Sequence, residues 1–251
     1  MTTVYIGCAG WNVPRAMEAD FPREGAHLER YAARLPAVEI DSSFHRSHRP
    51  STYARWAVSV PSAFRFSVKM PRAVTHQAPL GSCGPELAAF LDDIAPLGAR
   101  LGCLLAQFPP SLRFDAGAAR RFFGQLRERH AGAIAAEPRH PSWFESEADQ
   151  LLVDLEVARV ATDPARVPAA AEPGGWRGLV YYRLHGSPRT YYSSYDRAYL
   201  TTLADRLATF VRAGLPVWCI FDNTAVGAAA ANARDLLQTL ARVPGAMTRA
   251  L

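Results

Sequence analysis

The chain has 251 residues, of which 49% are hydrophobic and 20% are charged, and the absence of low-complexity runs excludes a largely disordered protein. Its formal net charge of +5 favours anionic partners only weakly, which excludes a binding mode that depends on net charge alone. The basic residues are nearly all arginine, and lysine occurs once, at Lys69.

Short β-rich runs recur along the whole chain. They lie at residues 4–9, 37–42, 64–69, 101–108, 133–137, 158–163, 179–185 and 217–222. Most of these runs are almost continuously apolar, which is typical of parallel strands covered on both faces.

Segments with helical periodicity separate the predicted strands. They lie at residues 26–35, 51–60, 85–98, 116–130, 145–157, 196–214 and 228–242. Eight predicted strands that alternate with these helical segments predict one domain over 1–251 with an α/β fold, a (β/α)8 TIM-like barrel. A doubly wound open sheet is the alternative, although GCAGWN after the first strand lacks the GxGxxG of a dinucleotide fold. Because residues 167–178 are rich in Pro and Gly, we expect irregularity around the sixth and seventh units.

The cysteines and the N-terminus bear on the compartment. Four cysteines occur without a CxxC pair, and three of them lie in apolar runs, so we expect buried free thiols. The N-terminus lacks a basic leader, and no stretch reaches the roughly 18 apolar residues of a spanning helix. These features predict a cytoplasmic protein with no membrane partner.

Polar and charged side chains collect where the predicted strands end, whereas the strand starts carry ordinary loop residues. In a TIM-like barrel the loops after the strands build the active site, so we expect these side chains to share one mouth. They are Gly10 and Trp11; Glu39, Asp41 and Ser43; Lys69; Gln107; Glu137, Arg139 and His140; Asp163; Arg183 and His185; and Asp222 and Asn223.

Several motifs resemble, in order and spacing, those of the DUF72 or YecE-like family of bacterial proteins. They are IGCAGW, VEIDSSFH, FRFSVK followed by TH, QFPPS, EPRHPSW, YYRLHG and FDNTAVGAAAANA, and they run from about residue 4 to residue 240. The resemblance implies a TIM-barrel-like fold and a function that is unassigned. The positions that match the family pattern are Gly7, Gly10, Trp11, Glu39, Ser43, Phe44, Lys69, Thr75, His76, Gln107, Pro109, Glu137, Arg139, His140, Trp143, Asp163, Arg183, His185, Gly186 and Asn223.

This chain departs from the family pattern in its first two loops. It has Cys8-Ala9 where the family usually has Thr-Ser, His45 where the family has Tyr, and residues 12–20 in place of an aromatic-rich loop. Contacts supplied by these loops are therefore expected to differ.

Acid–base chemistry is one use for the mouth. Glu39 and Asp41 are two residues apart, so they share one strand face, and the pKa of one should rise. A structural ion pair of Glu39 with Lys69 or an arginine is the alternative, and such a pair would keep Lys69 charged. The predicted catalytic residues are Glu39, Lys69, Glu137, Asp163 and His185, with Glu137 or Glu39 as general base and His185 or His140 as proton donor.

Anion binding is the second use. Arg183 and His185 lie on one strand face, and residues 223–227 lead into a helix whose N-terminus favours an anion. Arginine–carboxylate pairs that close the mouth are the alternative. Replacing Arg183 with Ala is expected to abolish anion binding with little loss of stability. The predicted substrate-binding residues are Trp11, Gln107, Arg139, His140, Trp143, Arg183 and Asn223.

Aromatic residues after the strand ends have two interpretations. Trp11, Trp143 and the tyrosines of residues 191–195 are a stacking platform for a sugar or a base, or else plugs that pack the loops.

A divalent metal is a further alternative, and the cofactor is otherwise unknown. The mouth offers the ligand types of Zn, Mn or Mg, but no HxH or HExxH motif fixes a site, and hydrogen-bonding roles compete. The candidate ligands are Glu137, His140, Asp163 and His185, with His45 and His76 in nearby loops.

The sequence favours an enzyme of the hydrolase or isomerase type that binds a small anionic substrate bearing phosphate or carboxylate. A metal-dependent phosphodiesterase or endonuclease acting on nucleic acid is the first alternative. A non-catalytic module that binds nucleic acid or protein is the second alternative, and it predicts a mouth in which the carboxylates are paired to arginines.

Overall fold

Strand and helix alternate along the chain in the order that the apolar runs predict. The computed structural model describes residues 4–77 and 80–245. The strands are β1 Val4–Cys8, β2 Ala37–Ile40, β3 Arg65–Lys69, β4 Leu101–Gln107, β5 Ile134–Glu137, β6 Val157–Arg159, β7 Ala161–Asp163, β8 Gly174–Gly175, β9 Val180–Leu184 and β10 Val217–Phe221. The α-helices are α1 His27–Ala32, α2 Pro50–Val58, α3 Gly84–Ile94, α4 Ala116–Arg129, α5 Ser146–Asp154, α6 Arg197–Arg212 and α7 Ala228–Leu240.

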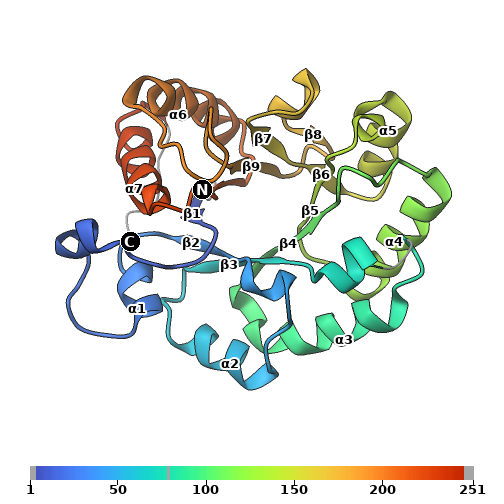
Figure 1. Cartoon of the computed structure of the whole chain (residues 1–251), viewed down its shortest axis with the longest axis horizontal. Helices are drawn as coiled ribbons and strands as arrows, with labels where there is room; N and C mark the ends of the chain where they lie inside the picture. The colour runs from blue at the N-terminus through green and yellow to red at the C-terminus, as the bar shows by residue number, and fades with distance from the viewer. Residues whose placement is uncertain (1–3, 78–79, 246–251) are drawn as a thin grey trace.

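The strands form two sheets. One has the order β1-β10-β9-β7 and the other has the order β2-β3-β4-β5-β6-β8. All of the paired strands are parallel except β6 and β8. Figure 1 shows the strands at the centre with the helices around them. The fold is therefore mixed α/β with parallel sheets, as predicted, but its hydrogen-bond ladders do not run as one continuous ring.

A tyrosine hydroxyl takes the place of a ladder between β1 and β2. The Tyr31 hydroxyl, from α1, accepts a hydrogen bond from the Cys8 amide at 2.8 Å and donates one to the Ala37 carbonyl at 3.0 Å. The two strands lie so close that a Cβ at Gly7 would come within 2.0 Å of the Ala37 oxygen. A single bridge between Ala9 and Glu39 continues the contact beyond the strands. Neighbouring edges of the two sheets thus meet without a regular ladder.

The sixth predicted strand joins both sheets. Its first half, β6, pairs with β5, whereas its second half, β7, pairs with β9. A short 3-10 helix at Pro168–Ala171 and the two-residue strand β8 follow, where other units carry an α-helix. The expected irregularity around the sixth unit is confirmed, and its cause is the Pro/Gly-rich sequence of residues 167–178.

Apolar side chains fill the interior of the strand layer beneath the polar groups at the strand ends. Every residue of β9 and β10 is buried, which explains why these runs are continuous in apolar content. Tyr181 stacks on Trp218 with ring centroids 5.9 Å apart, and Cys103 and Leu105 belong to the same cluster. The polar groups at the strand ends therefore rest on a packed apolar floor.

All four cysteines are free and buried, as predicted. Burial raises the pKa of the Cys8 thiol to about 12, so this thiol stays protonated near neutral pH. Within residues 4–77 and 80–245, no helix combines the length and apolar character needed to cross a membrane.

Candidate active site

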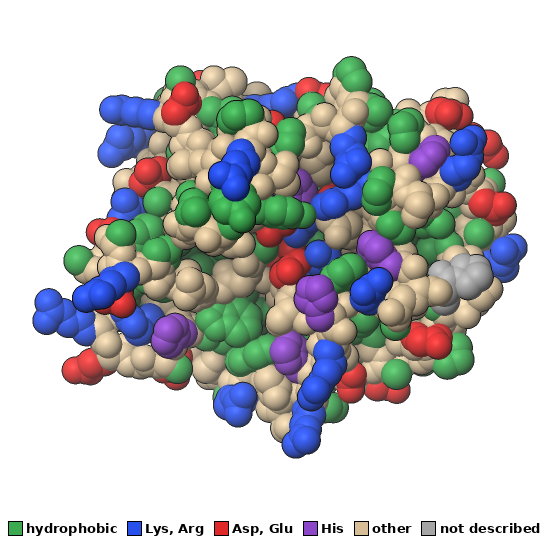
Figure 2. Space-filling model, in the orientation of Figure 1, with side chains coloured by type: hydrophobic (Ala, Val, Ile, Leu, Met, Phe, Trp, Pro, Cys, Tyr) green, Lys and Arg blue, Asp and Glu red, His purple; other side chains and the backbone are tan. Residues whose placement is uncertain are grey.

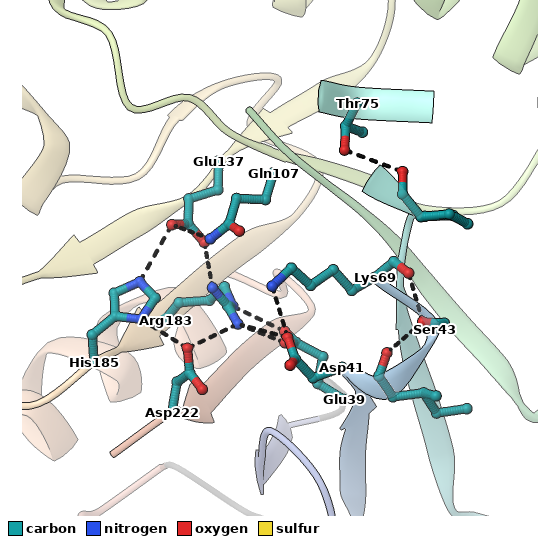
Figure 3. Close-up of polar contacts among 12 residues, drawn as sticks. Glu39, Asp41, Ser43, Lys69, Thr75, Gln107, Glu137, Arg183, His185 and Asp222 are labelled. Atoms are coloured by element: carbon teal, nitrogen blue, oxygen red, sulfur yellow. Dashed lines mark hydrogen bonds and ion pairs between the residues drawn. The ribbon is translucent and has the colours of Figure 1, made fainter. Parts of the chain in front are cut away.

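Side chains from both sheets meet at the carboxyl ends of the strands, and Figure 3 shows their contacts. The six-stranded sheet supplies Glu39 from β2, Lys69 from β3, Gln107 from β4 and Glu137 from β5. The other sheet supplies Arg183 from β9, with His185 just after it and Asp222 just after β10. Because the strands of each sheet are parallel, their carboxyl ends point the same way and can share one site.

Arg183 lies at the centre of this cluster and is completely buried. Its Nε and Nη2 donate to the two carboxylate oxygens of Glu39 at 3.0 and 2.6 Å. Its Nη1 donates to Glu137 Oε2 at 2.6 Å, and Nη2 also donates to Asp222 Oδ2 at 3.2 Å. A planar guanidinium suits this forked geometry: three carboxylates accept its hydrogen bonds, and Asp41 Oδ1 lies 3.8 Å from Nη2. Arg183 thus ties β2 and β5 of one sheet to β9 and β10 of the other.

Burial and charge act in opposite directions on these carboxylates. Burial acts to raise the pKa of Glu137, but the charges of Arg183 and His185 outweigh it and hold this pKa well below its usual range. The same balance, led by Arg183 and His185, lowers the pKa of Asp222. For Glu39 burial prevails over Arg183, and its pKa is raised. Glu137 and Asp222 are therefore ionised near neutral pH.

His185 lies between two carboxylates. Its Nδ1 is 2.9 Å from Asp222 Oδ2, and its Nε2 is 3.3 Å from Glu137 Oε1 but outside hydrogen-bonding geometry. Burial acts to lower the pKa of His185, but the charge of Glu137 and the hydrogen bond to Asp222 outweigh burial and raise it. The surroundings of His185 therefore favour the protonated form of its ring.

Lys69 and its neighbours form the other side of the site. Its ammonium group donates to Asp41 Oδ1 at 2.8 Å and lies 4.3 Å from the centre of the Phe44 ring. Phe44 is also in edge contact with the ring of His76. Desolvation, followed by the charges of Lys69, Arg72 and Arg139, lowers the pKa of His76. A neutral imidazole thus lies beside a group of cations.

A pocket of about 200 Å³ opens beside Glu137 and His185. Figure 2 shows acidic, basic and histidine side chains gathered at the centre of the face over the strands. The pocket is lined by Glu137, Pro138, Arg139, Thr162, Pro164, Ala165, Arg166, Ala170, His185, Thr190 and Tyr191. Its size suits a small metabolite, because drug-sized ligands occupy about 300–1,000 Å³.

The family model for "Protein of unknown function DUF72" matches residues 5–250. The chain belongs to the DUF72 family. YecE of Escherichia coli K12 is 28% identical to it over 173 residues, which are 66% of this chain and 61% of YecE. YunF of Bacillus subtilis is 29% identical over 149 residues, which are 56% of this chain and 52% of YunF. The matched regions span between half and two thirds of the length of these curated relatives.

Solved DUF72 structures share the fold of this chain. A DUF72 protein of Enterococcus faecalis superimposes with a TM-score of 0.80 at 21% identity, covering 96% of each chain. Another from Thermotoga maritima gives 0.74 at 24% identity, covering 95% of this chain and 99% of that one. This likeness shows the fold of the DUF72 chain and no particular reaction.

The DUF72 structure brings together Glu39, Lys69, Glu137 and His185 of the predicted catalytic set, but Asp163 lies apart. The charge of Asp163 acts, after burial, to raise the pKa of Tyr195 and of Tyr199, so its carboxylate is near these rings on the α6 side. Its neighbour Thr162 is the residue of β7 that lines the pocket. Successive side chains on a strand point to opposite faces, which explains the difference.

Two predicted substrate-binding residues support loops from buried positions. The ring of Trp143 is fully buried, stacks on Phe108 and donates through Nε1 to the Leu112 carbonyl at 3.0 Å. The Nδ2 of Asn223 donates to the Ser193 carbonyl and to Asn232 Oδ1 at 3.0 and 2.9 Å. These contacts point to packing and loop support in place of the ligand contact expected from the sequence.

The remaining predicted binding residues divide between the pocket and its surroundings. Arg139 lines the pocket and donates to Glu137 Oε1 at 3.1 Å, and Gln107 donates to the same oxygen at 3.0 Å. His140 caps the turn at Pro141–Phe144 through Ser142, and Trp11 contacts the edge of Trp56. Arg183 is fully buried among carboxylates and is not one of the residues that line the pocket. The sequence predicted that Arg183 contacts a ligand, whereas its contacts in the structure assign it to stabilising the cluster of carboxylates.

The candidate metal ligands do not assemble. Within the part of the chain that the structure describes, no three His, Cys, Asp or Glu side chains are grouped so that they could hold a metal ion. Glu137 and Asp222, the carboxylates nearest His185, are engaged by Arg183.

Arg166 and Tyr181 were not expected at the site. Arg166 lines the pocket from an irregular loop, and the sequence gives no signal that distinguishes it from other surface arginines. Tyr181 donates to Ser67 Oγ at 2.8 Å and lies 3.1 Å from Glu39 Oε2. Its alternation with Arg183 along β9 is a signal that could have placed it on the inner face.

Proposed function

We propose that this DUF72 protein is an acid–base enzyme of the hydrolase or isomerase type that binds a small anionic molecule in the pocket beside His185. The observation that carries the proposal is the buried imidazole of His185, which lines that pocket between the carboxylates of Asp222 and Glu137 and whose Nε2 is outside hydrogen-bonding geometry with any protein group that the structure describes. A histidine held protonated by two carboxylates is suited to give a proton to a bound ligand.

The other residues follow from this role. Glu137 and Asp222 hold His185 charged, and Arg183 keeps these two carboxylates in place. Of the two predicted general bases, Glu137 lines the pocket whereas Glu39 lies beneath Arg183. The lowered pKa of Glu137 and the hydrogen bonds to both of its oxygens assign Glu137 to holding His185. Arg139, which lines the pocket, supplies positive charge that stabilises an anionic ligand, whereas Lys69 lies outside the pocket lining and pairs with Asp41.

The proposal includes a TIM-like (β/α)8 barrel with the site at its C-terminal mouth, built as one domain. Two contacts support a ring that includes both sheets. The sixth run passes from β6 to β7, and the Tyr31 hydroxyl together with the Ala9–Glu39 bridge joins β1 to β2.

A second candidate is a binding module without catalysis. The observation in its favour is that Glu39, Glu137 and Asp222 all contact Arg183, as expected for a mouth closed by ion pairs. This candidate predicts ligand binding without turnover.

A turnover assay separates the two candidates. A panel of small carboxylates and phosphate esters is incubated with the protein and followed by ¹H and ³¹P NMR. We expect conversion of at least one compound, and a loss of about a hundredfold or more in rate for His185→Gln. The rate should also fall as pH rises through the raised pKa of His185.

The control for this assay is His27→Gln, which changes an exposed histidine at the start of α1. An unchanged rate in His185→Gln would overturn the catalytic role. Binding of panel compounds without any conversion would favour the binding module.

A further inference from the structure

The pocket beside His185 has more hydrogen-bond donors than free acceptors. Its ionisable lining consists of Arg139, Arg166 and His185 on the cationic side and Glu137 as the carboxylate. Both oxygens of Glu137 are already used, since Oε1 accepts from Gln107 and Arg139 and Oε2 accepts from Arg183. A ligand that fills this pocket must therefore bring its own acceptors.

The three cationic groups of the lining differ in their protein contacts. Arg166 is exposed and forms no ion pair with a carboxylate in the described residues. Arg139 donates to Glu137 through Nε, and its side chain also interacts with Tyr191 at the rim, so its guanidinium faces the pocket. The Nε2 of His185 is buried without a hydrogen-bond partner. Three cationic groups thus surround one small space.

The hydroxyl groups and apolar side chains of the lining limit the class of ligand further. Thr190 adds a hydroxyl group to the donors, whereas the hydroxyl of Thr162 donates to the Ala170 carbonyl at 3.4 Å. Apolar surface comes from Pro138, Pro164, Ala165 and Ala170, and the ring of Tyr191 lies at the rim in edge contact with His185. The pocket thus combines a strongly cationic part with room for a short organic body.

We propose that the ligand of this pocket is a small phosphate monoester whose phosphoryl oxygens are bound by Arg139, Arg166 and His185. The proposal rests on the proposed function and names its substrate class. A phosphate monoester presents three terminal oxygens and a charge near −2, which matches several cationic donors better than the two oxygens and single charge of a carboxylate. Guanidinium groups bind phosphate through paired hydrogen bonds.

Calorimetric titration with glycerol 3-phosphate tests the proposal, with glycerate as the carboxylate analogue. We expect glycerol 3-phosphate to bind the wild-type protein more tightly than glycerate does. We expect Arg139→Gln and Arg166→Gln each to weaken this binding by about tenfold or more, because each removes a charged hydrogen bond. Arg177→Gln, at an exposed arginine outside the pocket lining, is the matched control and should bind like wild type.

The outcomes separate the substrate class from the function. Equal or tighter binding of glycerate, weakened by Arg139→Gln, would overturn the phosphate class and leave an anion-binding enzyme. Absence of glycerol 3-phosphate binding at millimolar concentration, or binding that neither arginine variant weakens, would also overturn the phosphate class. The proposed function is tested separately by the turnover rate of the His185→Gln variant, and an unchanged rate would overturn it.

Discussion

At the scale of single residues, His185 is a buried titratable group that lines the pocket and contacts two carboxylates. Asp222 and Glu137 face its two ring nitrogens, Arg183 lies behind them, and the Tyr191 ring is in edge contact. An imidazole in a site of this kind gains its proton more readily in the folded protein than in the unfolded chain.

This difference makes stability depend on pH. Because the folded pKa of His185 is raised above the unfolded value of about 6.5, its contribution is fully present below pH 6.5 and is lost as pH rises through the folded pKa. We expect His185→Gln to lower the free energy of unfolding by about 1–2 kcal/mol at pH 6 and by less at pH 9. Urea unfolding across this range measures the effect, with His27→Gln as control. A loss of equal size at every pH would contradict the assignment.

At the scale of elements, the loop of residues 186–195 forms one rim of the pocket and depends on a few buried polar groups. Asn232 of α7 accepts from the Tyr195 amide and from Asn223, and it donates to the Tyr195 carbonyl at 2.9 Å. Tyr191 has a φ of 69°, and its amide donates to the His185 carbonyl at 2.5 Å. A left-handed conformation is unfavourable for a side chain of this size, so surrounding contacts must hold it.

Replacing Asn232 with Ala should release this loop. The change leaves both backbone groups of Tyr195 without their partner and removes one of the two hydrogen bonds of Asn223 Nδ2, so we expect a loss of about 2–4 kcal/mol in the free energy of unfolding. Amide exchange in residues 186–195 should accelerate more than exchange in β9 or β10. Gln238→Ala, at an exposed position of the same helix, is the control. Uniform acceleration over the whole chain would argue against a local role.

At the scale of the whole molecule, the two sheets meet through charge as well as through apolar packing. Arg183 on β9 contacts Glu39 on β2 and Glu137 on β5, residues that belong to the other sheet. Removing one partner of a buried ion pair is more costly than losing the pair, because the remaining charges are left without compensation.

Arg183→Met should therefore destabilise the protein strongly, which revises the sequence-based expectation of little change. We expect a loss of about 3–5 kcal/mol in the free energy of unfolding at pH 7, measured by urea unfolding. The loss should shrink as pH falls, because the buried carboxylates of the variant bind protons that Arg183 otherwise displaces. Adding Glu39→Gln should restore part of the stability. A loss below about 1 kcal/mol would show that Arg183 does not join the sheets.

The sequence alone determined the alternation of strand and helix, the irregular sixth unit, and the convergence of Glu39, Lys69, Glu137 and Arg183. The first two features depend on apolar periodicity and on Pro/Gly content, which are local properties of the chain, and the third follows from the rule that parallel strands end on the same side of a sheet. Only the tertiary structure decided which of the charged side chains at the strand ends are paired with other protein groups and which can contact a ligand. Pairing of Arg183 with three carboxylates, the turn of Asp163 toward α6, and the arrival of Arg166 at the pocket depend on distances between distant segments. Whether a buried charge binds a ligand or holds the fold depends on the partners that such distances allow.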